Sequence, residues 1–260
     1  MEYANIRVEK RANIAIVTLD RPKVLNALNS ETLEEIDAAF ADLSTDFTIR
    51  VVLLSGAGGR AFAAGADIRE LETLSGDEGR RFASRGQAVF RRIETLGKPV
   101  IACIQGFALG GGCELALACT LRLAADDARM GQPEVKLGVI PGYGGSQRLP
   151  RLVGRGEGYK LLLSGAIIGA QEALRIGLVD EVVPAADLMT RAEALAVEIA
   201  ANAPLAVAEL LKVVDEGLDL PLGAALEREA ERFGRLCDTA DKAEGTRAFL
   251  EKRQAAWRGE

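Results

Sequence analysis

The chain has 260 residues, of which 48% are hydrophobic, so it is long enough to bury the core of one large domain. Its net charge of −6 argues against a nucleic-acid-binding protein, because such proteins usually present a basic face to phosphates. The sequence contains no histidine. A Ser-His-Asp triad, a Cys-His pair and a histidine-rich metal site are therefore excluded, and acid–base chemistry falls to Glu, Asp, Lys, Tyr or Cys.

The N-terminal half of the sequence alternates strand and helix patterns. Apolar, β-branched runs predict strands over residues 13–19, 49–54 and 100–104. A helix is expected to begin at Asn29 or Ser30, with Glu34 placed for a capping box, and a second helix covers about 78–96. The glycine-rich segment 106–112 leads into a helix over 113–118, and a short strand follows at 121–124.

The predicted secondary structure changes after residue 183, from alternating strands and helices to helices alone. Residues 131–145 are rich in glycine and loop-like, and 178–183 (LVDEVV) predict the last strand. Amphipathic helices are then expected over 188–201, 204–218, 222–236 and 241–253. The alternation predicts an α/β fold of stacked sheet turns with helices outside. The C-terminal helices have no sheet of their own to cover, so they must dock on the body or on another subunit of a homo-oligomer.

The cysteines and the chain start favour a reducing, cytoplasmic setting. Cys103, Cys113, Cys119 and Cys237 form no CxxC pair, and three of them lie in apolar surroundings typical of buried thiols. The first residues, MEYANIRVEK, have neither a signal core nor a transit pattern. Residues 100–119 are mostly apolar, but Glu114 would be costly in a lone membrane span. A buried strand followed by a buried helix is expected there instead, without a membrane partner.

One glycine-rich segment weakly resembles a dinucleotide-binding motif. Residues 56–61 (GAGGRA) follow a strand with GxGxxA spacing. The expected helix does not follow at once, because residues 61–67 (AFAAGAD) are small and broken by glycine, and no acidic residue closes a second strand at the required distance. A dinucleotide site is therefore disfavoured.

Two other small-residue segments carry a stronger signal. Residues 63–68 (AAGADI) and 108–115 (ALGGGCEL) let a ligand approach main-chain N–H groups, and the second segment leads directly into a helix start, where N–H groups are free. One N–H from each segment would form a two-donor oxyanion hole for an enolate made from a thioester. The alternative is that these glycines serve only tight turns and close packing.

Two carboxylates stand out near these segments. Glu114 is the only acid between Glu94 and Asp126, and burial in its apolar run CELALAC would raise its pKa. Glu134 lies in the run GQPEVKLG, beside a proline. Brought together, the pair could hold one water between a general base and a general acid. Spacing alone leaves open that each is only a helix cap or a surface residue.

At these residues the chain resembles the enoyl-CoA hydratase/isomerase family, also called crotonases. The similar stretches are RPKVLNALN (21–29), AFAAGADIRE (61–70), IQGFALGGGCELALAC (104–119), GQPEVKLGVIPGYGGSQRLPRLVG (131–154) and SGAIIGAQEALRIGLVDEVVP (164–184). They occur in order over nearly the full length. The resemblance implies a spiral (ββα) core with the active site over residues 1–195, and a C-terminal helical region over 196–260. That region is expected to build a homotrimer or a homohexamer.

The resemblance also implies the roles of individual residues. Ala66 and Gly111 would supply the oxyanion-hole amides, and Glu114 and Glu134 the acid–base pair found in hydratases. Ala64, Asp67, Ile68 and Gly142 would contact the substrate, with the Gly142 N–H helping to place water. Tyr143 replaces a small residue common in some members, so it would narrow or polarise the pocket, or merely pack.

The implied reaction is reversible syn hydration of a trans-2-enoyl-CoA to a 3-hydroxyacyl-CoA, within fatty-acid or related acyl-CoA metabolism. No metal or redox cofactor is expected, and coenzyme A enters only as part of the substrate. Double-bond isomerisation is an alternative within the family, and a non-catalytic RNA-binding member is another. The candidate surface helices mix Glu with Arg, whereas RNA binding would favour a lysine-rich helix.

Overall fold

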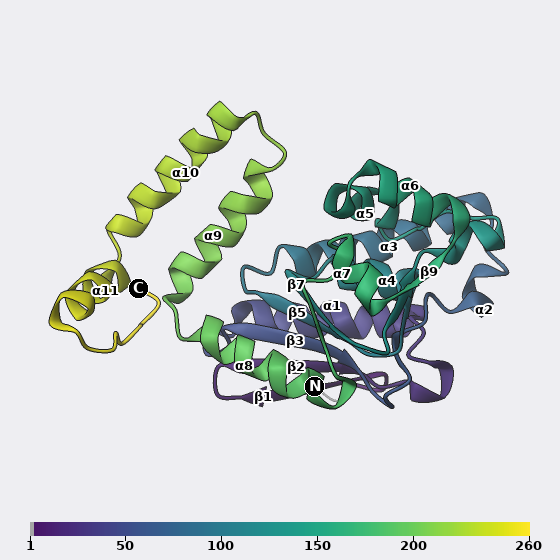
Figure 1. The fold of residues 1–260 in the computed structure, drawn as a ribbon, viewed down its shortest axis with the longest axis horizontal. Helices are drawn as coiled ribbons and strands as arrows, with labels where there is room; N and C mark the ends of the chain where they lie inside the picture. The colour runs from purple at the N-terminus through teal and green to yellow at the C-terminus, as the bar shows by residue number, and fades with distance from the viewer. Residues whose placement is uncertain (1–2) are drawn as a thin grey trace.

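Two β-sheets organise the larger part of the chain in the computed structural model, which describes residues 3–260 (Figure 1). The six-stranded sheet has the order β1-β2-β3-β5-β7-β10, with β1 and β2 antiparallel and the other neighbours parallel. Its strands are β1 (Ile6–Arg11), β2 (Ile14–Leu19), β3 (Val51–Gly56), β5 (Val100–Ile104), β7 (Leu121–Ala125) and β10 (Glu181–Val183).

A four-stranded sheet has the order β4-β6-β8-β9. Its strands are β4 (Ala61–Ala63), β6 (Phe107–Leu109), β8 (Arg129–Gly131) and β9 (Ile167–Gly169). The successive pairs β3/β4, β5/β6 and β7/β8 each give one strand to each sheet, so the chain advances as a spiral of similar turns.

The helices follow the strands in chain order. The α-helices of the body are α1 (Ser30–Thr45), α2 (Ile68–Leu71), α3 (Gly76–Glu94), α4 (Gly111–Leu117), α5 (Gly145–Val153), α6 (Arg155–Ser164), α7 (Ala170–Arg175) and α8 (Leu188–Ala200). Short 3₁₀ helices lie at η1 (Pro22–Val24), η2 (Pro133–Leu137) and η3 (Ala185–Asp187). Beyond α8 come α9 (Pro204–Gly217), α10 (Leu222–Cys237) and α11 (Ala240–Glu251).

Strand β2 shows how the sequence covers both faces of the larger sheet. Because successive side chains point to opposite faces, Ala15 and Val17 join the core formed with α1, α3 and α4. Ile14 and Ile16 join a second core with α8, whose buried face includes Ala192. Both faces are apolar, as expected for a sheet covered by helices on both sides.

Most of the longer predicted elements are present. The strand over 100–104 coincides with β5, and the helix predicted over 113–118 begins two residues earlier, at Gly111. The capping prediction is corrected in one detail, since Asn29 is the N-cap and accepts from the N–H of Thr32 at 2.9 Å, while Glu34 takes no part. Residues 61–63 form the strand β4, so no helix directly follows the GxGxxA segment, in agreement with the argument against a dinucleotide site.

Residues 100–119 form β5, β6 and α4, and α4 is buried along its whole length. Across residues 3–260 no single helix combines the length and apolar character needed to cross a membrane. The segments 185–200 and 204–217 meet these criteria only as a pair bent by 103°.

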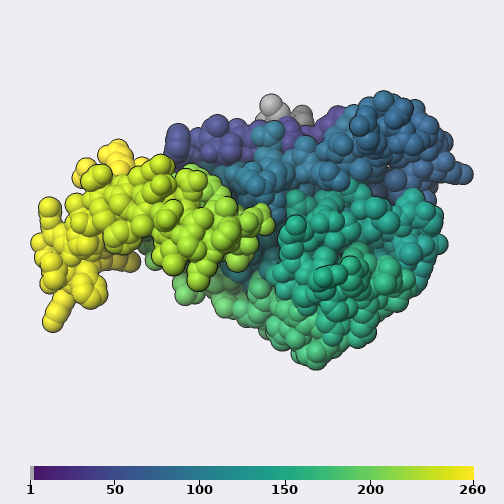
Figure 2. Space-filling model, turned by 90° about the horizontal axis from the view of Figure 1, so that it is seen from above, coloured from purple at the N-terminus to yellow at the C-terminus, as the bar shows by residue number. Residues whose placement is uncertain are grey.

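Helices α9, α10 and α11 extend from the sheet-containing body as an arm (Figures 1 and 2). The predicted division at residue 195 falls inside α8, whose Ala196 and Ala200 still pack on the sheet, so the arm starts after α8. Neither α9 nor α10 has a buried residue in the single chain. The apolar side chains of α9 and α10 are therefore at most partly covered in the single chain.

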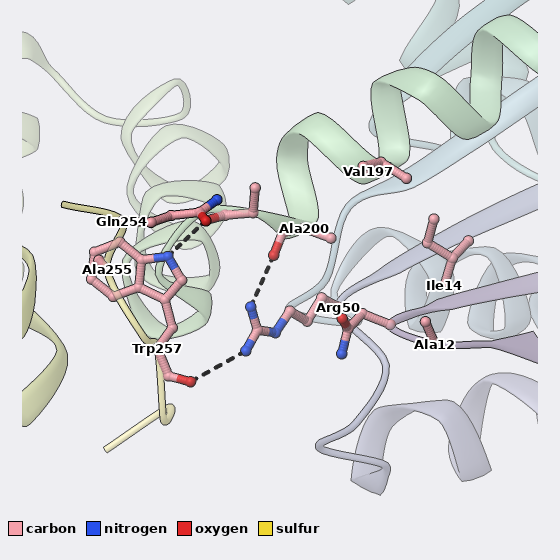
Figure 3. A pocket seen from close by; sticks show the side chains of 10 residues that line it. Ala12, Ile14, Arg50, Val197, Ala200, Gln254, Ala255 and Trp257 are labelled. Atoms are coloured by element: carbon pink, nitrogen blue, oxygen red, sulfur yellow. Dashed lines mark hydrogen bonds between the residues drawn. The ribbon is translucent and has the colours of Figure 1, made fainter.

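The base of the arm is fixed by Arg50 and Trp257, which line a cavity beside the end of α8 (Figure 3). The guanidinium of Arg50 donates to the carbonyls of Ala200 at 2.9 Å and Trp257 at 3.5 Å. The indole N–H of Trp257 donates to the carbonyl of Ala201 at 2.6 Å. The C-terminal residues thus fold back onto the junction between body and arm.

Replacing Gly112 by Ala is expected to destabilise the body by about 1–3 kcal/mol or more, because an added Cβ would overlap the main chain of Ala63 in β4. Thermal denaturation should show a lower Tm. The matched control is Gly156→Ala in α6, where an added Cβ meets nothing within 4 Å and Ala favours the helix. An unchanged Tm for Gly112→Ala would contradict the close packing of α4 on β4.

Candidate active site

A cavity of about 950 Å³ lies between the two segments singled out for their small residues. Its lining includes Ala64, Gly65, Ala66 and Ile68, which lie after β4 and at the start of α2, and residues 133–143 apart from Lys136. Helix α3 and the N-terminal end of α4 complete it. Ala64, Ala66, Ile68, Gly111, Glu114, Glu134 and Gly142 all line this cavity.

Two main-chain amides are available on this cavity. The Leu28 N–H donates to Gly65 O and the Asp67 N–H to Leu28 O, both at 2.8 Å, so the N–H of Ala66 points away from residue 28. Gly111 is the first residue of α4, where an N–H has no intrahelical partner. Within residues 3–260 neither amide donates to another protein group.

These two amides are neighbours in space. A Cβ placed on Gly111 would lie 3.2 Å from the nitrogen of Ala66. Gly65 and Gly110 both have positive φ, +108° and +49°, which an L-residue with a side chain rarely adopts. The glycines therefore allow the backbone turns that bring the two donors together.

The carboxyl group of Glu114 is held by main-chain N–H groups of another segment. Its side chain is only 1% exposed, and its Oε1 accepts the N–H of Tyr143 at 2.8 Å and the N–H of Gly145 at 2.7 Å. The pKa of Glu114 is raised to about 7, mainly by burial and also by the nearby charge of Glu134, while the two N–H bonds lower it. The carboxyl group is thus poised to exchange a proton near neutral pH.

Glu134 lies in η2, half-buried, with its carboxylate near the start of α4. A Cβ placed on Gly110 would lie 3.1 Å from its Oε1. Burial raises the pKa of Glu134 to about 6. Two carboxyl groups of raised pKa therefore share one cavity.

Gln132 is a site residue that the sequence did not single out. It is buried, and its amide nitrogen donates to both carboxylate oxygens of Glu134, at 2.8 and 3.1 Å, in the orientation that satisfies both groups. Its position two residues before Glu134, in GQPE, is the only feature of the local sequence that could have suggested a contact with that carboxylate. The contact fixes the direction of the Glu134 carboxylate.

Arg148 of α5 also supports the site, because it contacts the loop that holds Glu114. Arg148 donates from Nη1 to the carbonyl of Tyr143 at 2.9 Å, and its Nε and Nη2 pair with Glu94 at 3.0 and 3.2 Å. This ion pair ties the end of α3 to the loop that holds Glu114. Nothing in the local sequence pairs Arg148 with Glu94, which is why sequence reasoning missed it.

Asp67 is the one predicted site residue that the structure does not place on the cavity wall. Its side chain accepts from the N–H of Arg69 and caps α2, and it lies 3.6 Å from the guanidinium of Arg21. Its carboxylate is therefore engaged in fixing the chain around residue 67.

The chain is similar to known proteins over nearly its full length. The family model for enoyl-CoA hydratase/isomerase matches residues 9–260. The short-chain-enoyl-CoA hydratase of Clostridium acetobutylicum is 48% identical over 98% of this chain and 97% of the relative. The crotonyl-CoA hydratase of Syntrophomonas wolfei is 46% identical over 98% of each chain. The chain therefore belongs to the enoyl-CoA hydratase/isomerase family.

Solved structures lead to the same class. The enoyl-CoA hydratase of Bacillus anthracis superposes with a TM-score of 0.96 at 39% identity, covering 99% of this chain and 100% of that one. The α/β spiral fold predicted from the sequence is confirmed. With these relatives, the protein is an enzyme of the enoyl-CoA hydratase type.

Replacing Glu114 by Gln is expected to raise the Tm more at pH 8 than at pH 5. The pKa of Glu114 is raised from 4.5 to about 7 on folding, so the folded chain binds the proton more tightly. The wild-type stability therefore falls as pH rises between these values, whereas Gln cannot ionise. Thermal denaturation at both pH values measures the difference.

The matched control is Glu198→Gln on the exposed side of α8, which should give the same small Tm change at both pH values. A Tm gain for Glu114→Gln that is equal at pH 5 and pH 8, or larger at pH 5, would contradict the raised pKa.

Proposed function

We propose that the enzyme adds water reversibly and on one face across the C2=C3 bond of short trans-2-enoyl-CoA thioesters. The observation that carries the proposal is one cavity that joins two free amides, at Ala66 and Gly111, to two carboxyl groups of raised pKa, Glu114 and Glu134. The preference for short acyl groups is supported by the names of the Clostridium and Syntrophomonas relatives.

In this mechanism Glu114 is the general base for the attacking water. Its ionised carboxylate takes a proton as the water oxygen bonds to C3, and the C2=C3 electron pair shifts to make an enolate of the thioester. The amides of Ala66 and Gly111 donate to the enolate oxygen, and donors fixed in advance stabilise such a charge without reorganisation. Gly142 lies on the cavity wall, where its N–H would help to orient the water.

Glu134 completes the reaction as the general acid. The enolate electrons return to C2, which takes the proton of Glu134, and the net change is one added water. Glu114 then holds a proton and Glu134 lacks one, so exchange of a proton with solvent restores the pair. Gln132 keeps the Glu134 carboxylate directed into the cavity. These steps need no resident metal or redox cofactor, and we propose that coenzyme A enters only as part of the substrate.

The arm supports a homotrimer or a homohexamer. The arm exposes several large apolar side chains, and apolar patches on a protein surface are typical of interfaces. These are Leu210, Val214, Leu218, Leu222, Leu226, Phe233, Phe249 and Leu250, of which Leu218 is 82% exposed and Phe249 83%. A second copy of the chain is the proposed partner. All four cysteines are free, which is consistent with a reducing cytoplasm.

Glu114→Gln and Glu134→Gln are each expected to lower kcat for crotonyl-CoA by about 10²–10⁴-fold, because each removes one proton-transfer group. Loss of absorbance at the enoyl-thioester band measures hydration, and the same preparations should still bind butyryl-CoA. Glu198→Gln is the control that keeps its activity. Near-normal hydration by either cavity variant would remove that residue from the mechanism.

The oligomer prediction is tested with Leu218→Asp, which places a charge on the exposed arm. The wild-type chain should have the mass of three or six subunits by light scattering, and the variant a lower mass at the same concentration. A wild-type mass of one subunit would refute the proposed assembly.

A further inference from the structure

We propose that the ring of Tyr143 closes the acyl end of the cavity and limits the enzyme to short 2-enoyl groups, with four carbons preferred. The inference rests on the proposed hydration reaction and identifies the side chain that selects its substrate. Tyr143 would thus have two roles. Its main-chain N–H holds Glu114, and its ring limits the length of the acyl group.

The cavity has an exposed mouth and a buried end. At the mouth Ile68 is 60% exposed and Ile140 is 75% exposed, whereas Glu114 and Tyr143 are only 1% and 2% exposed. Coenzyme A is large and charged, so it must remain at the mouth. The acyl group therefore enters first and occupies the buried end.

The direction of the acyl group brings it to the ring. With the thioester oxygen at the amides of Ala66 and Gly111 and C3 at Glu114, the carbons beyond C3 continue past Glu114. The N–H of Tyr143 lies 2.8 Å from the Oε1 of Glu114. A Cβ placed on Gly111 would lie 3.3 Å from Cδ2 of the Tyr143 ring. The ring of Tyr143 therefore borders Gly111, while the main chain of the same residue holds the base.

Helix α3 seals the same end of the cavity. Ala83, Gly86 and Gln87 are three and four residues apart, so they share one face of the helix. Gln87 donates to the carbonyl of Gly142 at 2.8 Å, and a Cβ placed on Gly142 would lie 3.7 Å from the Cβ of Ala83. Loop 142–143 is thus in contact with α3 along this face.

The ring is held in place by its neighbours. A Cβ placed on Gly86 would overlap the Tyr143 ring, so glycine at this position makes the space that the ring fills. The rings of Phe82 and Phe90 lie with centroids 5.4 Å from that of Tyr143, one tilted and one edge-on. Moving the ring aside would require α3 to move as well, since close-packed interiors resist such shifts.

The hydroxyl group of Tyr143 can be separated from the ring in an experiment. It is buried, and among residues 3–260 it has no hydrogen-bond partner. Removing an unpaired buried hydroxyl is not expected to destabilise the fold. Tyr143→Phe therefore keeps the barrier and is the matched control for Tyr143→Ala, which removes it. Both variants retain the main-chain N–H that holds Glu114.

The test compares kcat/KM for crotonyl-CoA, trans-2-hexenoyl-CoA and trans-2-octenoyl-CoA within each variant. We expect the wild type and Tyr143→Phe to prefer crotonyl-CoA over octenoyl-CoA by tenfold or more. Tyr143→Ala should reduce that ratio by about tenfold or more, which is the size of effect that one pocket contact has on specificity. Because each ratio is internal to one variant, a general loss of activity does not disturb it.

A binding measurement covers the case in which Tyr143→Ala turns over too slowly. Titration calorimetry with butyryl-CoA and octanoyl-CoA needs no chemistry, and octanoyl-CoA should bind about tenfold tighter to Tyr143→Ala than to Tyr143→Phe. Equal affinity of the two variants for octanoyl-CoA would overturn the proposal. So would a wild type that hydrates octenoyl-CoA as well as crotonyl-CoA. A wild type that hydrates no enoyl-CoA would instead refute the proposed function itself.

The position of the ring is tested independently by Gly86→Ala. The added methyl group should lower the Tm in the wild-type background, where it overlaps the ring, and should have much less effect in Tyr143→Ala. An equal loss of Tm in both backgrounds would show that the ring does not fill the space at Gly86 and would overturn the proposal.

Discussion

The site depends on one interaction, in which a single carboxylate oxygen of Glu114 accepts the main-chain N–H groups of Tyr143 and Gly145. It joins α4, which presents the oxyanion amide of Gly111, to the loop that contains Tyr143. Because main-chain donors belong to the fold and not to flexible side chains, the carboxylate is fixed before substrate arrives. The other carboxylate oxygen remains available to a water in the cavity.

Burying this carboxyl group costs free energy, and the surrounding contacts show how the fold accommodates it. The two N–H bonds favour the ionised form, while burial and Glu134 favour the protonated form. The balance leaves the pKa of Glu114 near neutrality, where an acid–base catalyst is most effective. Arg148 and Glu94 stiffen the supporting loop without entering the cavity, so they influence the site through the position of Tyr143.

The body and the arm both contain amphipathic helices, but the apolar faces of these helices are buried in the body and at most partly covered in the arm. Helix α8 buries Ala192 and Ala196 on the larger sheet, so small residues allow a close approach to the strands. Helices α9 and α10 carry large apolar residues that no strand covers. An amphipathic pattern therefore predicts a helix in both regions, but it does not show what covers the apolar face. The larger sheet covers that face of α8, and a second copy of the chain covers it on α9 and α10 in the proposed assembly.

The sequence by itself determined the alternation of strands and helices and the four-helix C-terminal stretch, because hydrophobic period is a local property. It also narrowed the acid–base candidates, since a chain without histidine leaves carboxylates such as Glu114, in an apolar run, and Glu134, in a glycine-rich segment. The family motifs added the amides of Ala66 and Gly111. Short strands such as β4 escaped the pattern, because three residues are too few to show a period.

Only the tertiary structure decided which of these residues meet. Contacts between residues far apart in sequence, such as Gly86 with Tyr143 or Arg148 with Glu94, depend on how helices cross and leave no local pattern. The same holds for Asp67, whose motif position suggested a substrate contact while its side chain caps α2. Burial, and with it the raised pKa of Glu114, is likewise a property of the packed chain, because it requires neighbours from several elements to exclude water.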